Sequence, residues 1–243
     1  MAGHSKWANI QHRKKRQDAK RGKLFTKLIK EITVAAREGG GDADSNPRLR
    51  LALDKAFAGN MNKDTIEKAI NRGTGNLEGV NYEELSYEGY SSSGVALMVE
   101  CVTDNKNRTV AEVRHAFSKY SGNLGSSGSV SYLFNKIGVI SYDETDKGDE
   151  IVDIAIENNA IDYIQQEKYV EIHTDKADFL KITEVLKENN YIFDNAELEM
   201  HAETKIELVG ENAESFIKFI DALEELDDVQ NVYTNAEYHE KSS

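Results

Sequence analysis

The chain has 243 residues, enough for one large domain or two to three small ones, and 39% of them are hydrophobic, as in a folded protein. It carries 30 Lys/Arg against 43 Asp/Glu, a net charge of −13 that would normally indicate indifference to nucleic acid. Its apolar runs reach only about five residues, so we expect neither a membrane span nor a secretory signal.

The first thirty residues are strongly basic. They hold ten Lys/Arg against a single acid, Asp18, for a net charge of +9, so the remaining 213 residues carry −22. Residues 1–20 have few apolar side chains beyond Trp7 and Ile10, and we expect them to be mobile until a partner orders them. We call residues 2–20 the basic arm, and we call the negatively charged remainder of the chain the acidic body.

Three helices are predicted next, from apolar residues at helical spacing and from helix-end signals. Asn46 and Pro47 are typical of an N-cap and a first helical residue, and the glycines at 39–41 end the preceding helix. The predicted helices run from Gly22 to Arg37, from Pro47 onward, and from Asn62 or Asp64 to Gly73.

The periodicity then changes to short strands alternating with helices. We predict strands at 82–90, 94–102, 129–134, 138–142, 163–165, 169–173, 191–200, 204–209 and 229–234, and helices at 108–120, 150–158, 177–188 and 212–226. Cys101, the single cysteine, lies in the second of these strands and can form no internal disulfide, which favours a reducing, cytoplasmic setting.

The order of these elements predicts an α+β fold. Residues 136–200 spell β-α-β-β-α-β, the ferredoxin-like order, and 94–134 joined to 203–235 would form a second unit of that order. We therefore predict an N-terminal three-helix domain followed by two ferredoxin-like α+β domains, the last inserted in the middle one. The predicted domains are 1–76, 77–135 with 203–243, and 136–202; two consecutive α+β units with exchanged strands are the alternative.

Candidates for catalysis are weak. The six histidines are scattered, with no HExxH and no cysteine partner for a metal site, and Ser91-Ser92-Ser93-Gly94 lacks the frame of a nucleophile elbow. The paired carboxylates, Glu83-Glu84, Glu224-Glu225 and Asp227-Asp228, lie where solvated faces and helix ends are expected. We predict that the protein is not an enzyme and has no catalytic residue, metal, cofactor or small-molecule substrate.

A glycine-rich stretch, residues 122–129, could present backbone N–H groups to a phosphate. It follows a predicted helix instead of preceding one, and it matches neither the P-loop nor the dinucleotide fingerprint. We therefore favour a tight connection over a phosphate site.

The stretch Thr103 to Thr109 lies at a predicted strand-to-helix junction. Asp104, Asn105 or Asn107 can cap the helix, which explains part of the sequence. The nearby cations Lys106, Arg108 and Arg114 could instead provide a second phosphate contact, and the two interpretations are evenly balanced.

The stretch AGHSKWANIQHRKKRQDAKRGKLFTKL closely resembles the opening of the YebC/PmpR family, which includes a mitochondrial translational activator. The resemblance continues through TDNKNRT and VRHAFSKYSGNLGSSGSVSYLF and covers essentially the whole chain. It implies three domains around a central cleft and a DNA-binding transcriptional regulator of the cytoplasm. Some members resemble ribosome-associated factors that relieve stalled translation. Departures at Ser121 and at Ser92-Ser93 concern loops only.

The resemblance also implies which residues bind nucleic acid. From the N-terminal stretch these are His4, Lys6, Trp7, His12, Arg13, Lys14, Arg21, Lys23 and Lys27, and from the second stretch Asn107, Arg108 and Arg114. The charge pattern adds Lys15, Arg16 and Lys20, because cations neutralise phosphates and release counterions.

Together with the resemblance, the charge pattern favours two functions, and an enzyme acting in the cleft of the acidic body is a distant third. The protein either regulates transcription by binding DNA, or associates with ribosomal RNA or the ribosome as a translation factor, and no membrane contact is expected. The predicted third helix has only two cations between Thr65 and Arg72, so base reading by a helix-turn-helix is weakly supported. A solvated tail that only aids solubility is the remaining alternative for the arm.

Overall fold

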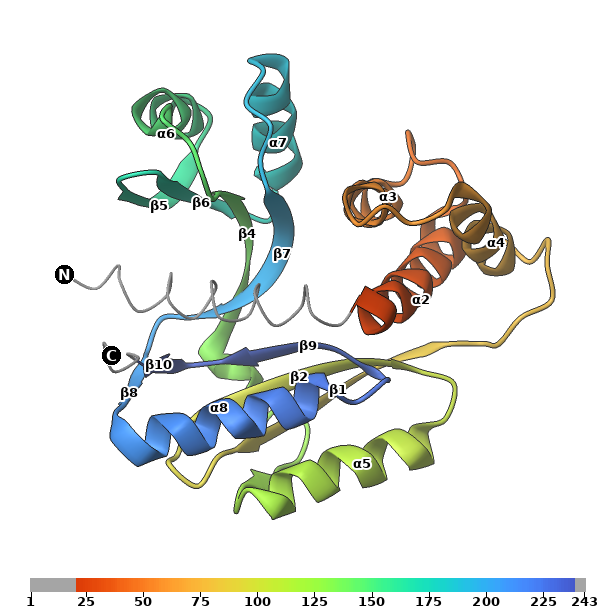
Figure 1. The fold of residues 1–243 in the computed structure, drawn as a ribbon, viewed down its shortest axis with the longest axis vertical. Helices are drawn as coiled ribbons and strands as arrows, with labels where there is room; N and C mark the ends of the chain where they lie inside the picture. Colours follow the sequence, from red (N-terminus) through yellow and green to blue (C-terminus); the bar gives the residue numbers. More distant parts are fainter. Residues whose placement is uncertain (1–20, 239–243) are drawn as a thin grey trace. The chain divides into compact units, whose positions relative to one another are not determined.

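The structure is a computed structural model that describes residues 21–238 (Figure 1). The predicted basic arm, residues 2–20, lies outside the described residues. The chain divides into two compact units: unit 1 comprises Met1–Leu133 and Ala202–Ser243, and unit 2 comprises Phe134–His201. The predicted three-domain division and the central cleft stay predictions. None of the helices between residues 21 and 238 is long and apolar enough to cross a membrane.

Unit 1 begins with the three predicted helices, α2 (Arg21–Gly39), α3 (Pro47–Ala58) and α4 (Lys63–Gly73). The Asn46 side chain caps α3 by accepting a hydrogen bond from the Leu49 amide at 3.1 Å, and Asn62 caps α4. The Asn46 amide group also donates to the Ala35 carbonyl at 2.8 Å, so the cap of α3 is joined to α2. Ile32, Leu49 and Ala69 are fully buried where the three helices meet.

Gly73 determines how closely α4 approaches α2. A Cβ atom at this position would lie 2.4 Å from the Thr33 carbonyl oxygen and 2.7 Å from the Ala36 Cβ atom, well inside van der Waals contact. The glycine that was predicted as the end of a helix is therefore also the point where two helix backbones touch.

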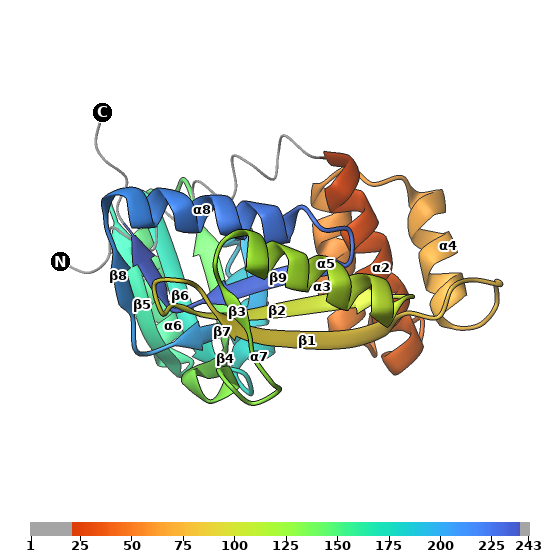
Figure 2. The ribbon, with the colours of Figure 1, turned by 90° about the horizontal axis from the view of Figure 1, so that it is seen from below.

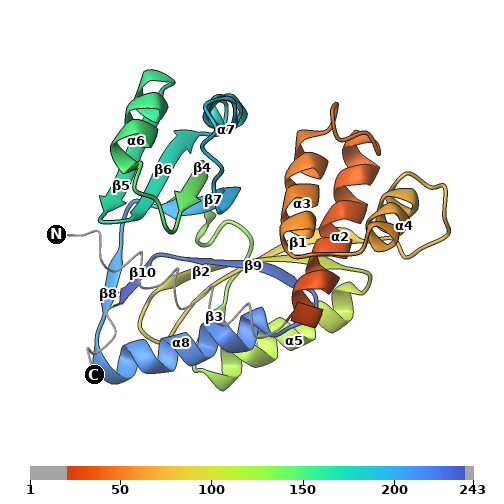
Figure 3. The ribbon, with the colours of Figure 1, turned by 45° about the horizontal axis from the view of Figure 1, so that its top comes forward.

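A four-stranded sheet covered by two helices completes unit 1. Its elements are β1 (Glu83–Tyr90), β2 (Ala96–Thr103), α5 (Lys106–Lys119), β3 (Asn123–Leu124), β8 (Ile206–Leu208), α8 (Gly210–Glu224), β9 (Val229–Thr234) and β10 (Ala236–Tyr238). The strand order is β3-β1-β2-β9, and β2 pairs antiparallel with both neighbours. Helices α5 and α8 lie on the same face of this sheet (Figures 2 and 3), where Phe117 and Phe219 pack edge to face at 5.0 Å.

The strand order of unit 1 differs from the ferredoxin-like order in one position. Strand β1 lies between β3 and β2, in the place that the predicted order gives to β8, and β8 pairs instead with β10 in a separate parallel ribbon. The reason is local: β1 and β2 are joined by a short turn at residues 91–95, where the Ser91 amide donates a hydrogen bond to the Val95 carbonyl oxygen at 2.8 Å. A hairpin between neighbouring strands forms with little loss of chain entropy.

The predicted strand at 129–134 is wrong. Ser131–Leu133 forms a single 3₁₀ turn, and the next strand begins only at Phe134. The carboxylate of Glu88 accepts hydrogen bonds from the amides of Val130 and Ser131, at 2.7 and 2.8 Å, so these groups are not available to a strand ladder.

Unit 2 has the predicted ferredoxin-like order. It consists of β4 (Phe134–Tyr142), α6 (Gly148–Glu157), β5 (Ala160–Gln166), β6 (Tyr169–Asp175), α7 (Phe179–Glu188) and β7 (Asn195–Ala202). The strands are arranged β5-β6-β4-β7, with β6 antiparallel to both β5 and β4. Ile140, Ile172 and Ile182 are fully buried in its core. The α+β fold class is therefore confirmed.

Replacing Gly73 by alanine should lower the stability of unit 1 by about 1–3 kcal/mol, because the new methyl group must displace the Thr33 carbonyl or the whole of α4. The measurement is the midpoint of chemical unfolding followed by circular dichroism. Gly22→Ala is the matched control, since a Cβ atom there meets nothing within 4 Å and alanine favours a helix. Equal midpoints for the two variants would contradict the close approach.

Candidate nucleic-acid interface

Three lysines lie along one face of α2 at spacings of four and three residues: Lys23, Lys27 and Lys30. Their ammonium groups donate to carbonyl oxygens at the C-terminal end of α8 and just beyond it, respectively those of Glu225 (2.5 Å), Glu224 (3.3 Å) and Asp227 (2.8 Å). The last carbonyl groups of a helix lack partners within it and carry partial negative charge. We call these three residues the lysine row. It caps α8 and joins α2 to the sheet of unit 1.

Asp228 lies at the inner end of the lysine row and is only 1% exposed. Its carboxylate accepts hydrogen bonds from Lys30 Nζ at 2.8 Å, from Arg108 Nη2 at 2.8 Å, and from the hydroxyls of Thr103 and Thr109 at 3.1 and 2.8 Å. Burial alone would raise the pKa of Asp228. The hydrogen bonds from Lys30, Arg108 and Thr109 outweigh burial and lower that pKa to about 2. Asp228 is therefore a fully ionised, fully paired buried carboxylate.

The predicted second binding stretch has separate roles in the structure. Asn105 is the residue that caps α5, accepting a hydrogen bond from the Arg108 amide at 3.1 Å. The Arg108 guanidinium contacts Asp228 and also Asp104, at 2.7 Å, so it serves the buried cluster. Asn107 and Arg114 are exposed on α5, and neither side chain has a hydrogen bond or ion pair with another residue in the range 21–238.

The glycine-rich stretch already holds a carboxylate. Glu88 is 6% exposed and accepts hydrogen bonds from the amides of Gly128, Val130 and Ser131 at 2.7–2.9 Å. Burial opposes its charge, but the backbone donors prevail and the pKa of Glu88 lies below its usual value. A phosphate would have to displace Glu88 to reach these amides, which supports the favoured interpretation of a tight connection.

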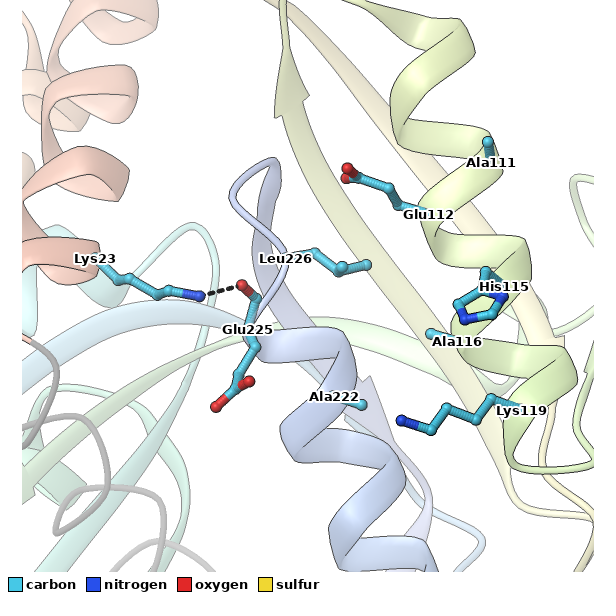
Figure 4. A pocket seen from close by; sticks show the side chains of 9 residues that line it. All are labelled: Lys23, Ala111, Glu112, His115, Ala116, Lys119, Ala222, Glu225 and Leu226. Carbon is cyan, nitrogen blue, oxygen red and sulfur yellow. Dashed lines mark hydrogen bonds between the residues drawn. The ribbon is translucent and has the colours of Figure 1, made fainter.

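A groove of about 550 Å³ lies between α5 and α8, beside the start of α2 (Figure 4). We call it the helix groove. It is lined by Lys23, Ala111, Glu112, His115, Ala116, Lys119, Ala222, Glu225 and Leu226. Small apolar side chains form much of its wall, and the His115 and Lys119 side chains reach from α5 toward α8.

Most of the predicted nucleic-acid-binding residues lie outside the described residues. These are His4, Lys6, Trp7, His12, Arg13, Lys14, Lys15, Arg16 and Lys20. Arg21 is the first residue of α2, and Lys23 and Lys27 belong to the lysine row. The structure thus brings Lys23 and Lys27 together on α2, while Asn107 and Arg114 lie on α5.

Sequence reasoning missed Lys30 and Asp228, the two residues that complete the buried cluster. Asp228 was interpreted as half of a solvated Asp227-Asp228 pair, although Val229, which follows at once, is apolar and begins β9. That adjacency is the only local signal. Its partners are 120 and 198 residues away, too far for any periodicity to indicate them.

Unit 2 contains a second buried polar cluster. Glu171 is fully buried and accepts hydrogen bonds from the Tyr169 hydroxyl and from His173 Nε2, and the ring of His201 lies 5.6 Å from that of His173. Burial, with the charge of Glu171, raises the pKa of Tyr169. Between residues 21 and 238, no group of three or more His, Cys, Asp or Glu is placed to hold a metal ion.

Comparison with known proteins gave consistent matches along the chain. Residues 5–76 match the model of the TACO1/YebC protein N-terminal domain, and residues 82–236 match that of the TACO1/YebC second and third domain. A "probable transcriptional regulatory protein" of Nitrosococcus oceani is 57% identical over 242 residues, covering 99% of this chain and 98% of that protein. A protein of the same description from Idiomarina loihiensis is 55% identical over 238 residues, covering 98% and 96%.

One solved structure is also similar. The crystal structure of a conserved hypothetical protein from Aquifex aeolicus has a TM-score of 0.84 and 44% sequence identity, and the match covers 93% of each chain. At this identity the likeness extends beyond the fold to nearly half of the individual residues.

Replacing Asp228 by asparagine should destabilise unit 1 by about 3–5 kcal/mol at pH 7, because the buried Lys30 would lose its counter-ion and the partly exposed Arg108 one of its two. The stability that Asp228 contributes is present above the pKa of an unfolded aspartate, about 4, and is lost as pH falls toward about 2. The difference between the variant and the unmodified chain should therefore shrink across this interval.

Chemical unfolding at pH 7, 4 and 2.5 measures both effects. Asp227→Asn is the matched control, since the Asp227 side chain is 79% exposed and its carboxylate lies 3.9 Å from Lys23. A loss at Asp227 as large as that at Asp228 would contradict the central role of the buried carboxylate.

Proposed function

This chain belongs to the TACO1/YebC family, and from that premise we propose that it is a non-enzymatic, nucleic-acid-binding regulator. Its basic arm binds the phosphate backbone of DNA in the cytoplasm and so regulates transcription. The curated relatives are named as probable transcriptional regulatory proteins, which supports the regulatory part of this proposal.

The observation that carries the proposal is the division of charge along the chain. Residues 1–76 hold seventeen Lys/Arg against eight acids, a net of +9, whereas residues 77–243 carry −22. Unit 2 alone holds six lysines, no arginine and seventeen acids. Phosphates attract the first part and repel the second, so the charges orient the protein with its arm toward the nucleic acid.

The structure supports the arm with a firmly held helix. The arm leads directly into α2, which the lysine row and Asp228 join to α8 and to the sheet of unit 1. Charged hydrogen bonds therefore connect the helix that follows the arm to the core of unit 1. Such bonds are stronger than neutral ones, particularly where they are buried.

Ribosomal RNA is the second candidate target, with the protein acting as a ribosome-associated factor that relieves stalled elongation. The observation that favours it is the character of α4, the helix that a helix-turn-helix would use to read bases. Ile66 and Ala69 face the core, and between Thr65 and Arg72 the helix has only two cations. A protein without a base-reading helix binds mainly through phosphates, and these are common to DNA and RNA.

Reversing the charge of Arg13, Lys14, Lys15 and Arg16 with glutamate should weaken nucleic-acid binding by about a hundredfold or more, because the arm would lose its phosphate contacts. Fluorescence anisotropy with a labelled 24-base-pair DNA measures the affinity. If about six cations contact phosphate, the unmodified chain should show a log–log salt slope of about −5. The unfolding midpoint should not change.

The matched control reverses four exposed lysines of unit 2, Lys136, Lys168, Lys176 and Lys181, and so alters the net charge equally. Binding should change by less than about threefold, because these residues lie outside the arm. Equal losses in the two variants would show that total charge, and not the arm, governs binding.

The choice between DNA and RNA is tested by comparing a duplex DNA with a ribosomal RNA fragment of equal length at about 150 mM salt. The first candidate predicts tighter binding to DNA, by about tenfold. Tighter binding to the RNA, together with co-sedimentation of the protein with ribosomes, would replace the first candidate by the second. Equal and steeply salt-dependent binding to both would contradict either specific function.

A further inference from the structure

The helix groove has the size and surface of a site for one small, flat, partly apolar molecule. Its volume of about 550 Å³ lies in the range of ligand sites in proteins, about 300–1,000 Å³. Ala111, Ala116 and Ala222 line it together with Leu226, and these side chains leave room for a planar ring above them. A nucleobase is such a ring, and it gains from apolar contact when it is not stacked in a duplex.

Cationic and polar groups line the same groove from two sides, His115 and Lys119 on α5 and Lys23 on α2. His115 and Lys119 are one turn apart on α5, and Figure 4 shows both side chains directed toward α8. Lys23 enters from α2, with its ammonium group held on the Glu225 carbonyl oxygen at 2.5 Å. Because this hydrogen bond fixes the position of Lys23, one cation is already in place for a phosphate beside the groove.

The two acidic residues of the groove, Glu112 and Glu225, leave His115 and Lys119 accessible to a phosphate. The Glu225 carboxylate points away from α5 in Figure 4, and Glu112 lies on α5 nearly two turns before Lys119. A carboxylate repels phosphate but accepts hydrogen bonds from the amino group of a base. The arrangement therefore fits a phosphate near Lys119 and a base edge near Glu112.

The groove also lies close to the basic arm along the chain. The arm ends immediately before Arg21, and Lys23 is only two residues into α2. Two helical residues advance the chain by about 3 Å, less than the spacing between successive phosphates of an extended strand. Lys23 therefore follows the last cation of the arm, Lys20, by only three residues in the sequence.

We propose that the helix groove binds one unpaired nucleotide of the nucleic acid that the basic arm holds. The base lies against the alanines, the phosphate contacts His115 and Lys119 on α5, and Lys23 is available to a neighbouring phosphate of the same strand. This inference rests on the proposed function and deepens it, since it makes a distorted or unpaired segment the preferred target. A fully paired duplex has no unpaired nucleotide for the groove and contacts only the arm.

The test compares one 24-base-pair DNA duplex with the same duplex carrying a central bulge of three unpaired nucleotides. The unmodified chain should bind the bulged form about tenfold more tightly, the contribution expected of one stacked base. Ala111 occupies an exposed position of α5, so Ala111→Leu fills the groove without changing the charge. This variant should lose the preference for the bulged duplex and bind the paired duplex as tightly as the unmodified chain. Lys119→Gln should reduce the preference in the same way.

Ser118→Leu is the matched control for Ala111→Leu. It adds the same side chain to an exposed position of the same helix, outside the groove lining, and it should keep the preference. Thermal unfolding confirms that each variant is folded. The same two probes made of RNA show whether the groove accepts ribose or deoxyribose. Tighter binding to the bulged probe than to the paired probe, in either DNA or RNA, supports the proposal.

Two outcomes separate the failure of this inference from that of the proposed function. Binding to paired and bulged probes with equal affinity, or a preference that survives Ala111→Leu, would overturn the groove as a nucleotide site and leave the arm untouched. Absence of binding to every probe would overturn the proposed function itself.

Discussion

The buried carboxylate of Asp228 is the interaction on which unit 1 depends. It receives hydrogen bonds from α2 through Lys30, from α5 through Arg108 and Thr109, and from the end of β2 through Thr103. An ionised group inside a protein is costly unless every lone pair has a donor. Because the donors come from three separate elements, the carboxylate is satisfied only when all three are in place, so the cluster specifies one arrangement of unit 1.

The lysine row serves the fold with the same chemistry that phosphate binding uses. Lys23 and Lys27 match a nucleic-acid-binding pattern, and in the structure they donate to carbonyl oxygens at the end of α8. A helix C-terminus offers several oxygens of partial negative charge, much as a phosphate does. Because a lysine ammonium group has three N–H donors, a nucleic acid that binds Lys23 or Lys27 would share these groups with α8.

Local patterns were sufficient to predict much of this fold. Asn46 and Asn62 mark helix starts because a cap is made within three residues of itself, and the order of unit 2 follows from alternating short periods. The failures are long-range. Glu88 removes the amides of a predicted strand from 42 and 43 residues away, and Asp228 finds partners across 120 and 198 residues. The helix groove combines residues of three helical regions, so no single stretch indicates it.

The placement of unit 2 within the sequence of unit 1 has a consequence for biosynthesis. Strand β2 pairs with β1 as soon as both have been made, but its other edge must wait for β9, whose Val232 lies opposite Val99. At about 5–20 residues per second, the intervening chain takes on the order of ten seconds to emerge from the ribosome. For that interval an apolar strand edge is open to pairing with other chains, a recognised route to aggregation. Lys30 and Arg108 likewise lack their partner until Asp228 has been synthesised. All of unit 2 is therefore synthesised before unit 1, which surrounds it in the sequence, can complete its folding.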